Sequence, residues 1–257
     1  MPIITLTSDW GAKDHYLAAV KGRIKKQFPE ADIIDISHEI KPYSLREASF
    51  IIRNAFSNFP EGTVHLIAVR TESNSENPHM AAMYEQQYFV SADNGLFSLI
   101  FDFRPEKLVV LPNDSIQYPT FSALGSLVDA AVHLASGKNI EELGTGSDEW
   151  VERTHFRPVV TGNVIKGVVI YVDNYENLIT NITRNLFEEV GKGRKFLIEC
   201  RSEEVRKISE NYSKVGMGDV LALFSHAGNL EIAISHDRAS SLLGLYVNDS
   251  IRIEFFD

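Results

Sequence analysis

The chain has 257 residues, which is enough for one large domain or two of moderate size. Its 44% apolar and 23% charged residues are typical of folded globular proteins and exclude a disordered, collagen-like or coiled-coil chain. A net charge of −10 would repel nucleic acid, and no apolar run approaches the roughly 20 residues that a membrane span needs, so we expect a cytoplasmic protein that binds neither nucleic acid nor membrane.

The N-terminal half alternates between short β-type runs and longer runs with apolar residues every three or four positions. In chain order, we predict a strand at residues 3–7, a helix after Asp14, a strand at 32–36, a helix at 45–58, strands at 63–69, 87–91 and 107–111, and a helix at 126–136 that ends at Gly137. Strands and helices that alternate in this way predict an α/β domain with a mainly parallel sheet covered by helices.

Three local patterns refine these elements. Asp14 is the predicted N-cap of the first helix. The second helix begins with Ser44-Leu45-Arg46-Glu47, which fits a capping box in which the serine oxygen and the glutamate each accept a free backbone N–H. The sequence Asp93-Asn-Gly is first of all a hairpin or loop signal.

The pattern changes after Gly144, where a turn-rich stretch begins. Beyond it we predict short strands at residues 163–172, 178–182, 195–200, 220–224, 230–235 and 250–255, separated by Gly and Asn. The expected organisation is therefore an α/β domain at residues 1–145, a linker at 146–160 and a small β-barrel domain at 161–257.

Few residues stand out chemically. No two histidines have a metal-ligand spacing, so we expect no metal, and Cys200 stands in an apolar setting that favours a buried thiol. Asp9 follows the first strand, where it can accept hydrogen bonds from a ribose diol or brace a turn. Residues 173–177 follow a C-terminal strand and suit either an adenine or a tight turn. Tyr43 fits a ligand wall or the core.

At these residues the chain resembles the family of S-adenosyl-L-methionine hydroxide adenosyltransferases, which includes the fluorinases and chlorinases. The resemblance covers nearly the whole chain. It rests on the order and spacing of six short motifs: Leu6-Thr-Ser-Asp9-Trp-Gly-x-x-Asp14, Phe59-Pro-Glu-Gly-Thr-Val-His65, Ala92-Asp-Asn-Gly-Leu96, Asp173-x-Tyr-x-Asn177-x-x-Thr-Asn-Ile182, Leu230-Glu-Ile-Ala233 and Leu242-Leu-Gly-Leu245.

The resemblance implies an N-terminal α/β domain, a C-terminal β-barrel and a homotrimer whose ligand lies between the large domain of one subunit and the small domain of its neighbour. It implies that Asp9 binds the ribose diol, Asn177 the adenine edge and Asp173 the methionine amino group. Tyr43 would lie against the sugar, and Tyr175 would flank the adenine. S-adenosyl-L-methionine is then the substrate or ligand, and no separate cofactor is implied.

The chain departs from the family where the hydrolytic members have an aspartate, an arginine and a histidine that position or activate water. Arg70 stands in the place of the aspartate, and Ser122 in the place of the histidine. The arginine's place falls around Asn77 and Pro78. A second cation about 6 Å from the sulfonium would cost on the order of 3 kcal/mol at an effective dielectric near 20. The catalytic residues therefore stay unassigned.

The expected function is binding of S-adenosyl-L-methionine or adenosine at a subunit interface and, if the protein is active, hydrolysis of the former to adenosine and L-methionine. Glu72, Glu76 and His79 form a possible replacement set, which we favour less than loss of the ancestral chemistry. Arg70 is either a surface or interface arginine that pairs with a glutamate, or it binds a carboxylate or phosphate through two N–H donors. The alternatives are thus a non-catalytic protein for an anionic nucleoside and a structural trimer whose pocket is closed.

Overall fold

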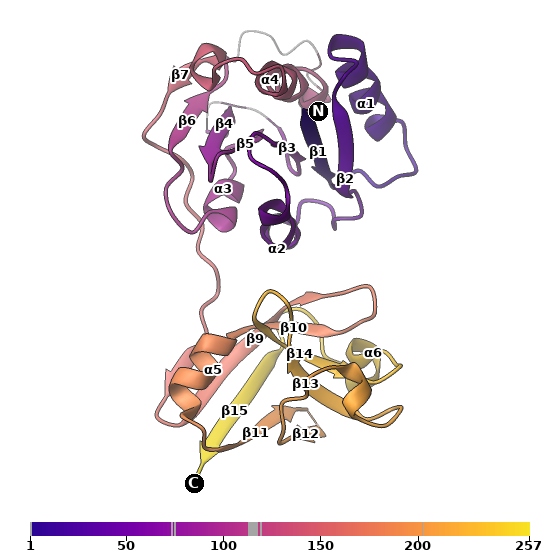
Figure 1. Ribbon diagram of the computed structural model, residues 1–257, viewed down its shortest axis with the longest axis vertical. Coiled ribbons are helices and arrows are strands. Elements are labelled where there is room, and N and C mark those ends of the chain that lie inside the picture. Colours follow the sequence, from indigo (N-terminus) through magenta and orange to yellow (C-terminus); the bar gives the residue numbers. More distant parts are fainter. Residues whose placement is uncertain (1, 73, 75, 113–117, 119, 202) are drawn as a thin grey trace. The chain divides into compact units, whose positions relative to one another are not determined.

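The computed structural model describes residues 2–72, 74, 76–112, 118, 120–201 and 203–257. The chain divides into two compact units, one running to Thr154 and the other from His155 to Asp257 (Figure 1). Residues 147–158, which include this boundary, form no helix or strand. Each unit is built around a sheet of its own. No helix in the described part of the chain is both long and apolar enough to cross a membrane.

The first unit consists of a sheet with helices on both faces. Its strands are β1 (Ile3–Ser8), β2 (Asp32–Ser37), β3 (Val64–Ala68), β4 (His79–Tyr84), β5 (Gln87–Ala92), β6 (Lys107–Val110) and β7 (Thr145–Gly146). Its helices are α1 (Tyr16–Gln27), α2 (Leu45–Ala55), α3 (Leu96–Ile100) and α4 (Ser126–Ala135), with short 3₁₀ helices η1 (Phe56–Asn58), η2 (Ser122–Leu124) and η3 (Ile140–Leu143).

This sheet is mixed, so the prediction of a mainly parallel sheet is wrong. Its strand order is β2-β1-β3-β5-β4-β6-β7. The pairs among β2, β1, β3 and β5 are parallel, whereas those from β5 through β7 are antiparallel. The difference arises from β4, which has the sequence HMAAMY and lacks the β-branched residues that favour a strand prediction. It lies antiparallel between β5 and β6, and β7 runs in the same direction as β4.

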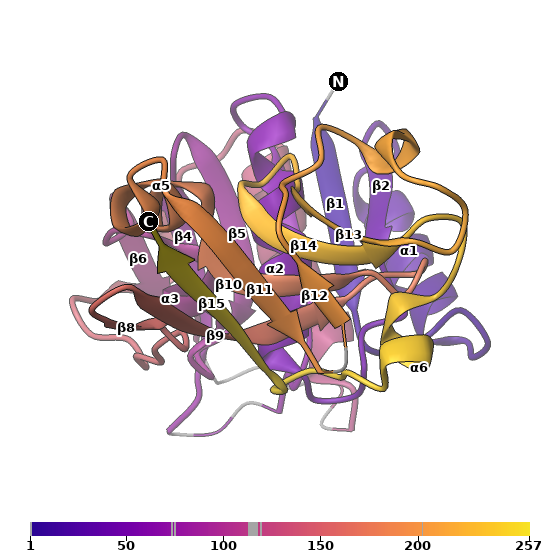
Figure 2. The same cartoon turned by 90° about the horizontal axis from the view of Figure 1, so that it is seen from below.

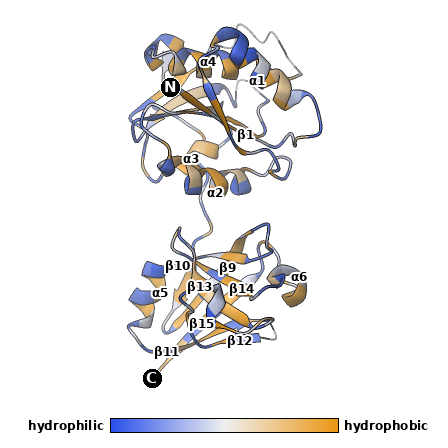
Figure 3. Cartoon of the chain, turned by 45° about the vertical axis from the view of Figure 1, so that its right-hand side comes forward, coloured by the Kyte–Doolittle hydropathy of each residue, from blue (hydrophilic) through white to orange (hydrophobic). Residues whose placement is uncertain are grey.

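Helices α1 and α4 cover one face of the first sheet, and α2 and α3 cover the other (Figure 1). Val20 and Ile24 of α1 pack with Leu127 of α4 against one face, while Ile52 of α2 and Phe97 of α3 pack against the opposite face. Figure 3 shows hydrophobic residues concentrated in the strands of both sheets, whereas α1 and α5 carry hydrophilic faces. Burial of these two apolar layers is the main contribution to the stability of the unit.

The two predicted helix caps have different outcomes. Asp14 is not the N-cap of α1, which begins at Tyr16 with His15 as its N-cap and no side-chain hydrogen bond there. Ser44 caps α2 as predicted, because its Oγ accepts from the backbone N–H of Glu47 at 3.4 Å. The carboxylate of Glu47 accepts from the backbone N–H of Lys41 instead of that of Ser44, so only the serine half of the capping box forms.

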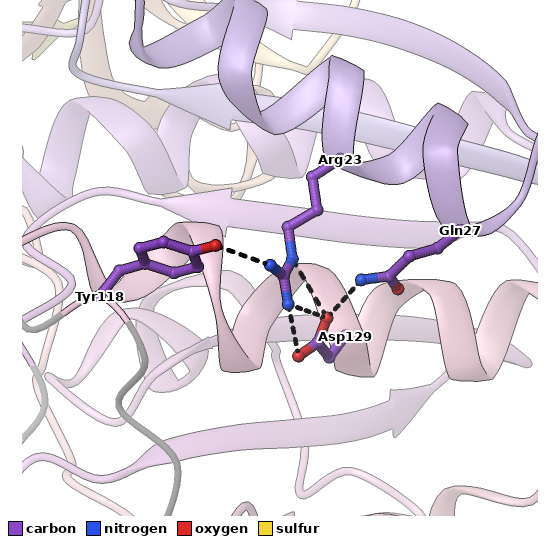
Figure 4. A network of polar contacts seen from close by, with 4 residues as sticks. All are labelled: Arg23, Gln27, Tyr118 and Asp129. Atoms are coloured by element: carbon purple, nitrogen blue, oxygen red, sulfur yellow. Dashed lines mark hydrogen bonds and ion pairs between the residues drawn. The ribbon is translucent and has the colours of Figure 1, made fainter.

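A polar network joins α1 to α4 (Figure 4). Arg23 donates from Nη2 to both carboxylate oxygens of Asp129, at 2.9 and 3.0 Å, and from Nη1 to the hydroxyl of Tyr118 at 3.2 Å. Gln27 donates to the same carboxylate at 2.7 Å. Asp129 therefore accepts hydrogen bonds from two successive turns of α1 and fixes how the two helices pack.

We expect Asp129→Ala to lower the free energy of unfolding by about 1 kcal/mol, because several hydrogen bonds to a half-exposed carboxylate are lost together. Urea titration followed by circular dichroism measures this change. The matched control is Asp148→Ala, which removes an exposed carboxylate paired with Arg104 alone. Equal effects of the two substitutions would contradict a special role for the network.

The second unit is an antiparallel sheet that curls almost into a barrel. Its strands are β8 (Val159–Thr161), β9 (Val164–Val172), β10 (Leu178–Thr183), β11 (Lys195–Cys200), β12 (Glu203–Val205), β13 (Val220–Phe224), β14 (Asn229–Ile234) and β15 (Ser250–Phe256). Its helices are α5 (Arg184–Gly191), η4 (Tyr212–Lys214) and α6 (Ala239–Leu243).

The strand order of this sheet is β12-β11-β15-β9-β10-β14-β13, with β8 paired to β9. Figure 2 shows β11 between β12 and β15. The two ends of the order approach each other, because Ile208, just after β12, forms a bridge with Ala222 of β13, and the N–H of Ser209 donates to the Ala222 carbonyl at 2.7 Å. The predicted C-terminal barrel is thus present as a nearly closed, barrel-like sheet.

Cys200 lies at the end of β11 and is fully buried in the core of the second unit. Burial raises the pKa of its thiol to about 12, and the nearby charge of Glu203 adds to the effect. Because the thiolate is the reactive form, this cysteine is chemically inert near neutral pH.

Candidate functional site

The first sheet has a topological switch point beside β1. Strand β1 lies between β2 and β3, and the connecting helices α1 and α2 cover opposite faces. Such a switch point leaves a crevice at the carboxyl ends of the strands, where α/β sheets bind their ligands. Ser8 pairs with Ala68, so Asp9 after β1 and Arg70 after β3 leave the sheet as neighbours.

Asp9 is half-buried and tied to the loop that follows β2. Its Oδ2 accepts from the backbone N–H of Tyr43 at 2.9 Å. Two further hydrogen bonds join the same loops: the N–H of Gly11 donates to the carbonyl of His38 at 2.7 Å, and Ser8 Oγ lies 2.6 Å from His38 Nδ1. The Asp9 carboxylate therefore has a fixed place at the switch point.

The surroundings of Asp9 favour its protonated form more than water does. Burial raises the pKa of the carboxyl above its usual value, the backbone hydrogen bond from Tyr43 lowers it, and the negative charge of Glu72 raises it. The backbone of Arg70 also lowers it. The net shift of the pKa is upward, so hydrogen bonds donated by a ligand would stabilise the charged form of this carboxylate.

Tyr43 presents its ring to solvent, with 68% of the residue exposed. Its backbone has a φ of 67°, a left-handed conformation that is uncommon for a residue with a side chain. Asp9 holds this conformation through the Tyr43 N–H. The ring does not belong to the core, so of the two interpretations left open by the sequence, the ligand wall fits its exposure better.

Arg70 is exposed and also has a left-handed backbone, with a φ of 52°. Among the residues that the structure describes, no carboxylate lies within ion-pairing distance of its guanidinium, and these include Glu72 and Glu76. Neither glutamate therefore pairs with Arg70 within this chain, and pairing with a glutamate at an interface stays a prediction. Ser73 and Ser75, in the same loop, lie outside the described residues.

Ser122 and His79 lie close to each other, because both bind the carbonyl oxygen of Thr71. Ser122 Oγ donates to it at 2.7 Å, and His79 Nε2 lies 2.9 Å from it. His79 is only 3% exposed, and its Nδ1 contacts the hydroxyl of Ser126. Burial lowers the pKa of His79, while the bond to Thr71 raises it. With both ring nitrogens occupied, His79 is a buried structural histidine in this arrangement.

An aromatic cluster that no sequence pattern predicted joins the Asp9 loop to the Ser122 loop. The rings of Trp10 and Tyr16 each lie 4.9 Å, centroid to centroid, from the ring of Phe121 in edge-to-face contacts. Trp10 directly follows Asp9, and Phe121 directly precedes Ser122.

In the second unit, residues 173–177 form a tight turn. The carboxylate of Asp173 accepts from the backbone N–H groups of Tyr175 and Asn177, at 2.9 and 2.8 Å, and from the side-chain amide of Asn177 at 3.0 Å. Asn177 is 7% exposed, whereas Tyr175 is 75% exposed. The turn interpretation is thus confirmed, and it leaves the ring of Tyr175 free to contact a ligand.

Glu176 connects this turn to α6, another contact that the sequence did not reveal. It has a φ of 63°, and its Oε2 accepts from the N–H of Ser241 at 3.0 Å. Its Oε1 lies 3.4 Å from Nη1 of Arg238.

The candidate site residues fall into two groups: Asp9, Tyr43, Arg70 and Ser122 lie in the first unit, and Asp173, Tyr175 and Asn177 lie in the second. In neither group, within the described ranges, do three or more His, Cys, Asp or Glu side chains assemble into a candidate metal site.

Most of the chain matches models of one protein family and is similar in sequence to known relatives. Residues 4–144 match the family described as the SAM hydroxide adenosyltransferase N-terminal domain, and residues 167–252 match its C-terminal domain. An (R)-S-adenosyl-L-methionine hydrolase from Methanocaldococcus jannaschii is 29% identical, over 98% of this chain and 96% of the relative. A fluorinase from an Actinoplanes species is 26% identical over 75% of each chain.

A similar fold occurs in the crystal structure of an uncharacterised conserved protein from Thermotoga maritima. It superposes with a TM-score of 0.88 at 28% identity and covers 97% of this chain and 99% of the other. The two-unit architecture is therefore shared over the full length.

Proposed function

The chain belongs to the SAM hydroxide adenosyltransferase family, and from that premise we propose that it binds S-adenosyl-L-methionine or adenosine. The observation that carries the proposal is the position of Asp9, a half-buried carboxylate at the switch point of the first sheet with one oxygen held by Tyr43 N–H. A carboxylate so placed has lone pairs left for the two hydroxyls of a ribose diol. The ring of Tyr43 then lies against the sugar.

The second group completes the proposed site. Asn177 would bind the adenine edge, Tyr175 would stack on the base, and Asp173 would accept the methionine amino group. The turn bonds of Asp173 occupy some of its lone pairs and leave others free, since an ionised carboxylate offers about four. Following the family resemblance, we propose that the two groups meet at a subunit interface of a homotrimer.

Hydrolysis has less support from the residues of the site than ligand binding has. Attack on the ribose carbon by water needs a base or an oriented water molecule. Arg70 and Ser122 replace the aspartate and histidine expected there. The hydroxyl of Ser122 donates a hydrogen bond to the carbonyl of Thr71, and both nitrogens of His79 are occupied. We therefore propose binding as the principal function, and hydrolysis to adenosine and L-methionine as the reaction to be sought if the protein is active.

One observation favours a second candidate, a non-catalytic site for an anionic nucleoside. Arg70 is exposed beside the Asp9 loop and has no acidic partner among the described residues. An uncompensated guanidinium repels a sulfonium and binds a phosphate or carboxylate through paired N–H donors. Adenosine monophosphate is the simplest ligand that joins this feature to the ribose site.

Calorimetric titration with adenosine, AMP and S-adenosyl-L-methionine tests these proposals together. Tightest binding of the sulfonium supports the first candidate, and tightest binding of AMP supports the second. Failure of all three ligands to bind would contradict both and indicate a structural trimer with a closed pocket. Chromatography of a long incubation with S-adenosyl-L-methionine tests catalysis, which is refuted if adenosine forms no faster than without protein.

The affinity for adenosine is expected to be constant near neutral pH and to fall as the pH drops through the raised pKa of Asp9, because the protonated carboxyl loses its charge and one acceptor. Dissociation constants measured from about pH 7.5 down to about pH 4.5 check this. Asp9→Asn is the control and should bind weakly at every pH. The same pH profile in that variant would assign the titration to another group.

A further inference from the structure

The chain segment that follows β3 is held by its backbone carbonyls. The side-chain amide of Asn94 donates to the carbonyl of Arg70 at 2.8 Å and to that of Val69 at 3.1 Å. Asn94 is 2% exposed, and its own Oδ1 accepts from the N–H of Leu96 at 3.2 Å. This side chain is therefore fixed on both sides, and its two donors are directed at the two residues that leave the strand.

The next carbonyl, that of Thr71, is held from the other side by Ser122 and His79. His79 is in turn fixed by Ser126, the first residue of α4. Three successive carbonyls, of residues 69, 70 and 71, thus accept from side chains of β4, of η2 and of the loop between β5 and α3. Segments that leave a strand toward solvent are commonly free to move, so this degree of restraint is unusual.

The restrained segment, residues 69–71, also contains a residue with a strained backbone conformation. Arg70 has a φ of 52°, a region that a long side chain occupies only where its surroundings hold it. Asn94 and the Thr71 contacts hold the residues on both sides of this torsion. Arg70 is exposed, and its backbone forms a hydrogen bond with the Asp9 carboxylate that lowers the pKa of Asp9.

We propose that Asn94, His79 and Ser122 are positioning residues that hold Arg70 so that its guanidinium binds an anionic substituent, such as a 5′-phosphate, on a nucleoside whose ribose lies on Asp9. This inference rests on the second candidate function, the site for an anionic nucleoside, and adds which residues hold the arginine that binds the anion. None of the three residues needs to touch the ligand. They act through the backbone of residues 69–71.

The first test measures how strongly the site prefers AMP over adenosine, as a ratio of dissociation constants. Ser122→Ala is expected to lower this ratio by roughly three- to tenfold with little change for adenosine, as for the loss of about one hydrogen bond. Ser122→Thr, which keeps the hydroxyl, should restore it. In an Arg70→Ala background, Ser122→Ala should have no further effect on the ratio.

Ser136→Ala is the matched control, because it removes a hydroxyl that donates to a backbone carbonyl, that of His133, at 2.7 Å on an exposed helix end. It should leave the ratio unchanged. Two results would overturn the positioning role. One is that Ser122→Ala weakens the binding of AMP and of adenosine equally, and the other is that Ser122→Ala still lowers the ratio of dissociation constants in the Arg70→Ala background.

The second test needs no ligand and therefore separates this inference from the proposed function. Titration of the Asp9 carboxyl by ¹³C NMR reports whether the Arg70 backbone keeps its place, because that backbone lowers the pKa of Asp9 while Glu72 raises it. In Asn94→Ala and in Ser122→Ala, the pKa of Asp9 should rise above that of the unmodified protein. An unchanged titration in Ser122→Ala, which removes only a half-buried hydroxyl, would refute the inference whatever the protein binds.

Discussion

Replacement of Arg70 by aspartate is expected to reverse the charge preference of the site, weakening AMP and strengthening S-adenosyl-L-methionine. A cation about 6 Å from the sulfonium costs up to about 3 kcal/mol at an effective dielectric near 20, and the exposure of Arg70 reduces this to about 1–2 kcal/mol. The opposite change applies to a phosphate. Loss of the positive charge alone should therefore shift the relative affinity of the two ligands by roughly 3 kcal/mol, which is about a hundredfold, and reversal of the charge in Arg70→Asp should give about twice that free energy.

Calorimetric titration of both ligands measures this shift. Arg70→Ala should give about half of it, since that variant removes one charge without adding the other. Arg104→Asp, which alters an exposed arginine paired with Asp148, is the control for a general change in net charge. If both ligands change in the same direction in Arg70→Asp, the guanidinium does not select ligand charge.

Asp9→Ala is expected to weaken adenosine by about 1–3 kcal/mol, or roughly 5- to 150-fold, because two hydrogen bonds from the ribose hydroxyls are lost. Asp9→Asn should retain the bond from Tyr43 N–H and lose much of the affinity. These two variants therefore separate recognition of the sugar from support of the loop.

The ligand itself supplies a second control. 2′-Deoxyadenosine should bind the unmodified protein more weakly than adenosine does, and the two should bind Asp9→Ala almost equally. A preference for adenosine that survives in Asp9→Ala would show that another group binds the diol.

The alternation of strands and helices predicted much of the first unit because its parallel strands are rich in β-branched residues and its helices are amphipathic. Strand β4 escaped prediction because its sequence, HMAAMY, owes its strand conformation to pairing with β5 and β6 and not to local preference. Asp14 has the chemistry of an N-cap, yet α1 starts two residues later, where no side chain caps it. Local sequence patterns do not reveal conformations that tertiary contacts determine.

The candidate site, too, could be predicted from the sequence only in part. The position of Asp9 after β1 could be predicted, since the end of a parallel strand is recognisable in the sequence. Its contact with Tyr43 could not, because the tyrosine takes part through a backbone N–H that any residue offers. The sequence Asp93-Asn-Gly predicted a hairpin or a loop, and it forms the loop between β5 and α3. The contact of Asn94 with the carbonyls of Val69 and Arg70 could not be predicted, because it depends on how β3 and β5 pair.

The buried Cys200 gives this chain a practical property. Since the sequence contains one cysteine, and burial holds that thiol in its unreactive form, maleimide dyes and nitroxide reagents have no native target at neutral pH. Cysteines introduced at exposed positions on each unit can then be labelled without altering the native chain. Fluorescence or spin-label spectroscopy on such derivatives would report how far apart the two units lie in solution, with and without nucleoside.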